Sequence, residues 1–155
     1  MSTIKQYRIF ADYHQFYLWD HEQSPTPPID YTDLDIDRRI KAAPYVVVIQ
    51  PERNMEVQVT LEVLDAPARL SLAEWDHVAE ASLALPSGRL EIHECTGGSV
   101  DTLPVAPGTY RVRVYCGGFD TLSEDRLDGD DHYRVMLWPA PPDDVQVLKQ
   151  YPHPR

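Results

Sequence analysis

The sequence alternates apolar and polar side chains with a period of two, and this pattern constrains the fold most. In residues 55–63, every second residue is Met, Val or Leu, and Glu, Gln or Thr stands between them. Residues 110–114 and 133–137 follow a similar pattern. Successive side chains of a strand point to opposite faces of a sheet, so a period of two is typical of a half-buried strand. Weaker strands are predicted at residues 7–10, 15–19, 45–49, 78–85, 89–95 and 145–151.

About nine short strands separated by turns rich in Pro, Gly and Asp predict a mainly β fold. We expect a Greek-key-like antiparallel β-sandwich with one short helix. The segment Pro107-Gly108-Thr109-Tyr110 resembles a tyrosine corner, in which the phenol hydroxyl binds backbone across a strand crossover. An ordinary turn followed by a core tyrosine is the alternative. The helix is predicted over residues 32–43, with Thr32 as its N-cap and Pro44 ending it. A second short turn of helix is predicted at residues 72–75.

The length of 155 residues predicts a single domain over residues 1–155, with residues 152–155 forming a frayed tail. No apolar run is long enough to span a membrane, and the first residues lack the apolar stretch of a secretory signal. These observations favour a cytoplasmic protein. In such a reducing compartment, Cys95 and Cys116 are expected to be free thiols rather than a disulfide.

The most acidic part of the chain is the segment of residues 120–132, which we call the acidic loop. The chain has a net charge of −11, and within this loop Arg126 is the only clear counter-charge. Such a field disfavours nucleic acid and attracts basic proteins and cations. The carboxylates of the loop are those of Asp120, Glu124, Asp125, Asp128, Asp130 and Asp131.

Three interpretations of the acidic loop are compatible with its sequence. It is a solvated loop whose Asp and Gly residues form turns, a surface that meets a basic partner, or a calcium site. The spacing is not that of an EF-hand, so no metal ligand is assigned with confidence. The weak metal candidates are Asp125, Asp128, Asp130 and Asp131.

No motif in the chain identifies a reaction, and no catalytic or cofactor-binding residue is assigned. The serines do not occur in a Gly-x-Ser-x-Gly segment, the His and Cys spacing does not indicate zinc, and there is no Gly-rich phosphate loop. A hydrolase that uses spatially paired carboxylates or His132 stays open, because such pairing is not visible in a sequence.

Aromatic residues on both faces of the predicted strand 15–19 allow two interpretations. The strand is buried on both sides, which we favour, or one face is an exposed aromatic patch. If that face is exposed, Tyr17 and Trp19 are suitable anchors for a protein partner, because aromatic side chains dominate protein–protein interfaces.

Four short segments carry a resemblance to a known family. They are Tyr13-His14-Gln15-Phe16, Thr26-Pro27-Pro28, Asp30-Tyr31-Thr32-Asp33 and Arg53-Asn54. On these segments the chain resembles the ComJ-like family of competence-associated inhibitors of a DNA-entry nuclease, over about residues 10–64. The resemblance implies a small acidic bacterial protein that binds a nuclease and blocks it. The acidic loop departs from this family and is similar to a Gly-Asp-Asp-His-Tyr segment of uncharacterised bacterial proteins.

Together these features predict an acidic, non-catalytic binding protein that inhibits a basic partner enzyme such as a nuclease. A calcium-binding β-sandwich module that uses residues 120–132, and a hydrolase, are the alternatives. No cofactor, nucleic acid or membrane partner is expected. The predicted partner-binding residues are Asp120, Glu124, Asp125, Asp128, Asp130, Asp131, Tyr17 and Trp19.

Overall fold

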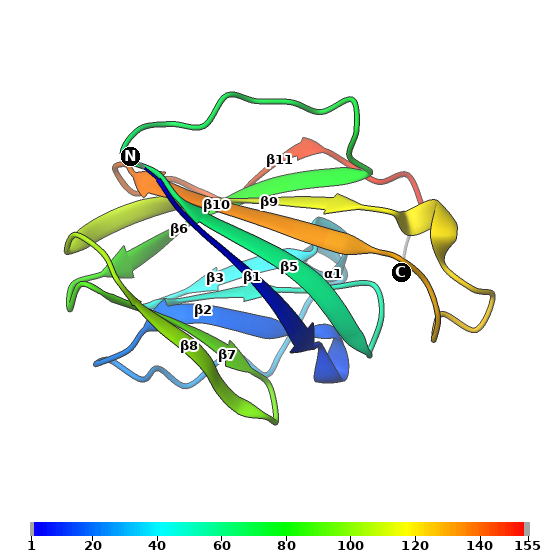
Figure 1. Ribbon diagram of the computed structural model, residues 1–155, viewed down its shortest axis with the longest axis horizontal. Coiled ribbons are helices and arrows are strands. Elements are labelled where there is room, and N and C mark those ends of the chain that lie inside the picture. The colour runs from blue at the N-terminus through cyan, green and yellow to red at the C-terminus, as the bar shows by residue number, and fades with distance from the viewer. Residues whose placement is uncertain (1, 154–155) are drawn as a thin grey trace.

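The computed structural model describes residues 2–153 and consists of two β-sheets that pack face to face (Figure 1). The six-stranded sheet has the order β1 (Thr3–Phe10), β5 (Glu56–Val63), β10 (His132–Pro139), β9 (Gly108–Gly117), β6 (His77–Leu85) and β11 (Gln146–Lys149). The five-stranded sheet has the order β3 (Ile40–Ala43), β4 (Val46–Ile49), β2 (Phe16–Asp20), β7 (Arg89–Glu94) and β8 (Gly98–Pro104). This arrangement confirms the predicted β-sandwich.

Each predicted strand is found, with ends that differ by a few residues, and the structure adds β3 and β8. One strand pair differs from the antiparallel expectation, since β10 runs parallel to β5. The direction of β10 is set by its antiparallel pairing with β9, and that of β5 by its pairing with β1. Alternation in a sequence gives the face of a side chain but not the direction of the neighbouring strand.

The helix is shorter than the sequence predicts. Helix α1 (Asp33–Arg38) begins at Thr32 as expected: the Thr32 hydroxyl accepts from the Asp35 N–H at 3.1 Å, and the Asp35 carboxylate accepts from the Thr32 N–H at 2.9 Å. It ends at Arg39, whose φ of 59° is left-handed. Residues 40–43 then form β3 instead of continuing the helix, because they pair with β4. Residues 72–75 form a turn rather than a second helix.

The main core lies between the two sheets, and side chains on parts of the outer faces are also buried. Arg111 and Arg113 of β9 lie on the outer face of the six-stranded sheet, where both bind the buried carboxylate of Glu80. The connection between β5 and β6 passes over this face in Figure 1, and Arg113 donates to the Ala68 carbonyl in it. Alternate residues of β9 therefore face two different buried environments. One is the apolar core between the sheets, and the other is the ion-paired cluster on the outer face.

The structure also bears on the predictions made for Tyr110, the two cysteines, membrane spans and the C-terminal tail. The Tyr110 hydroxyl donates to the Ala106 carbonyl at 2.6 Å, which confirms the tyrosine corner. Cys95 and Cys116 are free, as expected. None of the helices within residues 2–153 is both long and apolar enough to cross a membrane. The tail is held further than predicted, because the Arg39 guanidinium donates to the His153 carbonyl at 3.2 Å; residues 154–155 lie outside the described residues.

Candidate functional site

The acidic loop connects β9 to β10 and extends beyond one end of the six-stranded sheet (Figure 1). Five of its predicted partner-binding residues are exposed, and they are Asp120, Glu124, Asp125, Asp128 and Asp130. Ser123, Glu124, Asp125 and Asp128 line one shallow hollow in its surface. The structure thus presents a group of carboxylates to solvent at this end of the molecule.

Asp131 differs from its neighbours because it lies inside the protein, with 2% of its surface exposed. Its carboxylate pairs with the Arg53 guanidinium and accepts from the Tyr133 hydroxyl at 2.7 Å. The same hydroxyl oxygen accepts from the Glu52 N–H. Asp131 is therefore a buried anchor of the loop and not part of the exposed surface, which corrects its assignment to the partner-binding set.

Arg126, the counter-charge within the loop, reaches a buried carboxylate although its own side chain is 48% exposed. Its guanidinium binds the Glu52 carboxylate at 2.6 Å, and Glu52 in turn binds the fully buried Arg39 at 2.6 Å. Arg126 is therefore engaged with a carboxylate outside the loop. One buried ion pair, Arg53–Asp131, and one half-exposed pair, Arg126–Glu52, thus anchor a loop whose other carboxylates are exposed.

Side chains within the loop hold its backbone in a series of turns. The Ser123 hydroxyl accepts from the Asp128 N–H at 3.0 Å and donates to the Asp125 carboxylate at 2.7 Å. Asp125 also accepts from the Leu127 N–H at 3.1 Å, and these hydrogen bonds lower the pKa of its carboxyl group. The loop therefore contains the Asx-type turns that the sequence allowed for.

The weak metal candidates do not come together as a metal centre. Within residues 2–153, no group of three or more His, Cys, Asp or Glu side chains is placed to hold a metal ion. Asp131 binds Arg53, and Asp125 is used within its own turn. Calcium binding by residues 120–132 stays a prediction to which this geometry adds nothing.

The two aromatic candidates lie on the outer face of the five-stranded sheet. Phe16 and Leu18 of β2 point into the main core, whereas Tyr17 and Trp19 form a second cluster with Val46 and Val48. Tyr17 is 5% exposed and Trp19 is 8% exposed. The strand is thus buried on both sides, as favoured, and neither ring is an exposed anchor.

A cavity of about 430 Å³ lies on this face, and we call it the aromatic cavity. The Tyr17 and Trp19 rings are stacked at 5.6 Å with a 9° angle between their planes, and His93 of β7 lies 4.4 Å from Trp19. Register explains the arrangement, since Tyr17 pairs with His93 and Val48 across the sheet. The lining residues are Tyr13, Gln15, Tyr17, Trp19, Thr26, Pro27, Pro28, Ile29, Tyr31, His93 and Cys95.

Hydrogen bonds hold the rings of the aromatic cavity in place. The Tyr17 hydroxyl donates to Gln15 Oε1 at 2.7 Å and lies 3.2 Å from Cys95 Sγ. The Tyr31 hydroxyl donates to the Pro28 carbonyl at 3.0 Å and lies 3.2 Å from the same Gln15 oxygen. Burial raises the pKa of Tyr17, and it raises that of Tyr31 to about 12, so both hydroxyl groups stay protonated near neutral pH. Gln15 thereby contacts both the Tyr17 and the Tyr31 hydroxyl groups.

Tyr13 forms an exposed rim of the cavity in a left-handed backbone conformation. Its φ is 57°, that of His14 is 58°, and the Tyr13 side chain is 67% exposed. Non-glycine residues with positive φ are uncommon and cost free energy unless the surroundings fix them. Here the Ala11 N–H donates to the Met55 carbonyl, and His14 Nδ1 lies 3.3 Å from the Pro51 carbonyl. Residues 50–55 therefore contact the cavity rim through Pro51 and Met55, and they also contain Glu52 and Arg53, which anchor the acidic loop.

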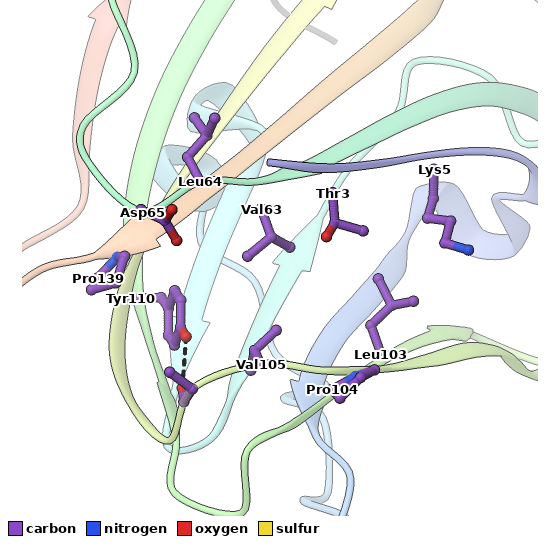
Figure 2. A pocket seen from close by; sticks show the side chains of 11 residues that line it. Thr3, Lys5, Val63, Leu64, Asp65, Leu103, Pro104, Val105, Tyr110 and Pro139 are labelled. Carbon is purple, nitrogen blue, oxygen red and sulfur yellow. Dashed lines mark hydrogen bonds between the residues drawn. The ribbon is translucent and has the colours of Figure 1, made fainter. Parts of the chain in front are cut away.

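A second cavity, of about 410 Å³, opens between the edge strands β1 and β8 beside the tyrosine corner (Figure 2). Val63, Leu103 and Val105 form its apolar part, and Figure 2 shows Lys5 and Asp65 toward opposite sides of it. Its lining contains none of the residues that carry the family resemblance. The candidate functional site consists of the aromatic cavity, whose lining includes such residues, and the acidic loop, which carries most of the predicted partner-binding residues.

No protein-family model and no curated protein sequence matches this chain. Two solved structures share its fold. The chain is similar to ComJ from Bacillus subtilis, an inhibitor of the DNA-degrading activity of NucA, with a TM-score of 0.71 and 16% identity over 90% of this chain and 99% of that one. It is also similar to the product of crocagin biosynthetic gene J, with a TM-score of 0.60 and 21% identity over 91% of this chain and 99% of that one.

These likenesses confirm the ComJ-like resemblance at the level of fold. The sequence carried it over about residues 10–64, and the structure extends it to nearly the whole chain. The recognised segments also meet in space: residues from Tyr13-His14-Gln15-Phe16, Thr26-Pro27-Pro28 and Tyr31 line the aromatic cavity, and Arg53 anchors the acidic loop. Sequence reasoning did not identify Gln15, Tyr31 or His93 as site residues, although the first two stand within these segments.

Proposed function

We propose that this chain is a non-catalytic protein that binds and inhibits a nuclease in the cytoplasm. The observation that carries the proposal is the likeness to ComJ, a nuclease inhibitor, over 90% of the chain. The acidic character supports it independently, because enzymes that degrade DNA bind a polyanion through basic surfaces. A protein with a net charge of −11 is attracted to such surfaces and repelled by DNA itself.

The acidic loop supplies the first contact in this proposal. Glu124, Asp128 and Asp130 are exposed, and Arg126 is directed toward Glu52. Such a loop can occupy a phosphate-binding cleft as an anionic substitute for DNA. Complementary charge raises the association rate, and the gain falls as salt screens the exposed carboxylates. The buried anchors at Asp131 and Glu52 fix the loop before binding, which limits the conformational entropy lost on association.

Affinity capture from an extract of the source organism tests the proposal. We expect the immobilised chain to retain a basic nuclease in a stoichiometric amount, and high salt to release it. The purified nuclease should cleave DNA, and the chain should suppress that cleavage. A captured protein without nuclease activity, or a nuclease whose activity the chain does not change, would contradict the proposal.

A matched pair of variants makes the capture specific. The loop variant combines Glu124→Gln, Asp128→Asn and Asp130→Asn. The control variant combines Glu22→Gln, Asp143→Asn and Asp144→Asn, which removes the same charge. These three exposed residues lie outside the acidic loop, Glu22 after the end of β2 and the two aspartates after the end of β10. We expect the loop variant to lose capture at moderate salt and the control variant to keep it. Equal loss in both variants would mean that net charge alone, and not the acidic loop, mediates retention.

A further inference from the structure

The aromatic cavity is lined by ring faces and prolines without ionic groups. Among the residues that the structure describes, its lining includes no Lys, Arg, Asp or Glu side chain. Tyr17 and Trp19 lie nearly parallel, and Tyr31, Pro27 and Pro28 also line the cavity. The negative π face of an aromatic ring attracts cations within about 6 Å, and a cavity of this volume admits a side chain.

A buried carboxylate beside the cavity makes its floor more negative. Glu91 of β7 accepts from Trp19 Nε1 at 2.8 Å and from His21 Nδ1 at 3.1 Å. Burial alone would raise the pKa of Glu91, but hydrogen bonds from Trp19, Ser99 and His21 outweigh burial and lower it. Glu91 is thus ionised at neutral pH. An anion that accepts from the indole N–H draws the proton toward itself and enriches the ring in electron density, which strengthens its attraction for a cation.

We propose that the aromatic cavity receives an arginine side chain of the protein partner. This inference rests on the proposed function for the identity of the partner, but not for the chemistry of the cavity. The charge favours a cation, because the described lining includes no Lys or Arg side chain and the Glu91 carboxylate, which His21 contacts at 3.1 Å, lies beside it. The shape favours arginine over lysine, because a planar guanidinium stacks on aromatic rings, and four aromatic residues (Tyr13, Tyr17, Trp19 and Tyr31) line this cavity.

One lysine approaches the cavity wall without occupying it. Lys41 Nζ lies 5.1 Å from the centre of the Tyr31 ring and is paired with the Asp35 carboxylate at 2.8 Å. Its charge is therefore neutralised locally, so it does not repel a second cation strongly. One exposed carboxyl group stands near the rim in the chain, because Asp30 lies between the lining residues Ile29 and Tyr31.

Titration of the isolated chain with two matched probes tests the cavity chemistry. Nα-acetyl-arginine amide carries the guanidinium, and Nα-acetyl-citrulline amide has nearly the same shape without the charge. The readout is the indole N–H resonance of Trp19 in ¹H–¹⁵N spectra, with Trp75 and Trp138 as internal references. We expect a saturable shift of the Trp19 resonance with the arginine probe and about tenfold weaker binding of the citrulline probe. Equal binding of both probes, no binding of either, or a response confined to Trp75 or Trp138 would overturn the proposal.

Two substitutions separate a local effect from the overall field. Glu91→Gln keeps an acceptor for Trp19 and removes the buried charge, whereas Glu124→Gln removes one charge from the acidic loop. We expect Glu91→Gln to weaken the arginine probe severalfold and Glu124→Gln to leave it nearly unchanged. Equal weakening by both would overturn the assignment to the cavity. The Trp19 resonance and the thermal transition of each variant report whether it is folded.

Kinetics of the complex then test whether the occupant belongs to the protein partner. With the captured partner, Glu91→Gln should raise the dissociation rate severalfold, and Glu124→Gln should leave that rate nearly unchanged. A cavity that binds the arginine probe while Glu91→Gln leaves partner dissociation unchanged would overturn the assignment to a partner side chain. Failure to capture a nuclease would refute the proposed function but would leave the probe titration as a separate result.

Discussion

The acidic loop and the aromatic cavity are connected through residues 50–55 but differ in chemistry. The loop directs exposed carboxylates outward and is anchored by ion pairs that are largely buried. The described lining of the cavity includes no Lys, Arg, Asp or Glu side chain, and hydrogen bonds around Gln15 hold its rings. Exposed charges act at long range and control how fast a partner arrives, whereas desolvated ring contacts control how long it stays. Under the proposed function, we therefore expect the two regions to act in different steps of one binding event.

The largest expected effect concerns the anchor of the loop. Asp131→Ala leaves Arg53 without its carboxylate in a largely buried position, and we expect a loss of about 3–5 kcal/mol in the free energy of unfolding. Asp130→Ala changes the adjacent exposed carboxylate and should cost less than about 0.5 kcal/mol. Urea unfolding of both variants measures the difference. Similar stability of the two variants would show that the loop is not anchored through Asp131.

The second prediction concerns the buried imidazole of His77 and the pH dependence of the free energy of unfolding. Burial lowers the pKa of His77 to about 4, and the ring is held in its neutral form because Nε2 lies 2.7 Å from the Arg38 carbonyl while Nδ1 accepts from the Tyr151 N–H at 3.1 Å. The unfolded chain binds this proton below about pH 6.5 and the folded chain only below about pH 4. His77 therefore supports the fold above about pH 6.5, and about 2 kcal/mol of stability should be lost between pH 7 and 4.5.

Urea unfolding across this range, for the wild type and His77→Gln, measures the contribution. The glutamine variant should be less stable at pH 7 and should lack most of the decline between pH 7 and 4.5. His153→Gln is the control, because His153 is exposed, and it should keep the decline of the wild type. An undiminished decline in His77→Gln would contradict the role given to the buried imidazole.

The division between association and dissociation is tested directly by the loop variant. With Glu124→Gln, Asp128→Asn and Asp130→Asn combined, we expect the association rate to fall about tenfold at low salt and the dissociation rate to change little. The difference in association rate should shrink at high salt as the wild-type charges are screened. Stopped-flow kinetics with the captured nuclease measures both rates. An effect on dissociation alone would remove the distinction between the two regions.

The smallest expected effect concerns calcium. Asp131 is occupied by Arg53, and within residues 2–153 no group of carboxylates is placed to hold an ion, so millimolar calcium should not change the melting temperature measurably. Magnesium at the same concentration controls for ionic strength. A rise with calcium alone, lost in Asp128→Asn, would restore the calcium-binding interpretation of the acidic loop.

The sequence predicted the sandwich better than the site because strand alternation is local and the site contacts are not. Each predicted strand was found, but β3 was missed because Ile40 and Ala43 also fit a helical stripe, and only the pairing with β4 decides between them. Asp130 and Asp131 are identical in type and adjacent in sequence. What separates them is Arg53, 78 positions away from Asp131, and no local pattern indicates that pair. Tyr17 and Trp19 were placed correctly on a strand buried on both sides, but the cavity around them needs residues from three separate segments.

The most direct measurement of the central claim is the DNA-cleavage rate of the captured nuclease as this chain is titrated into it in excess magnesium. The excess matters because exposed carboxylates can lower nuclease activity merely by chelating the metal. A specific inhibitor predicts a linear fall in activity that ends at a fixed molar ratio and does not change when more magnesium is added. Activity that persists at a large excess of the chain, or that magnesium restores, would contradict the account.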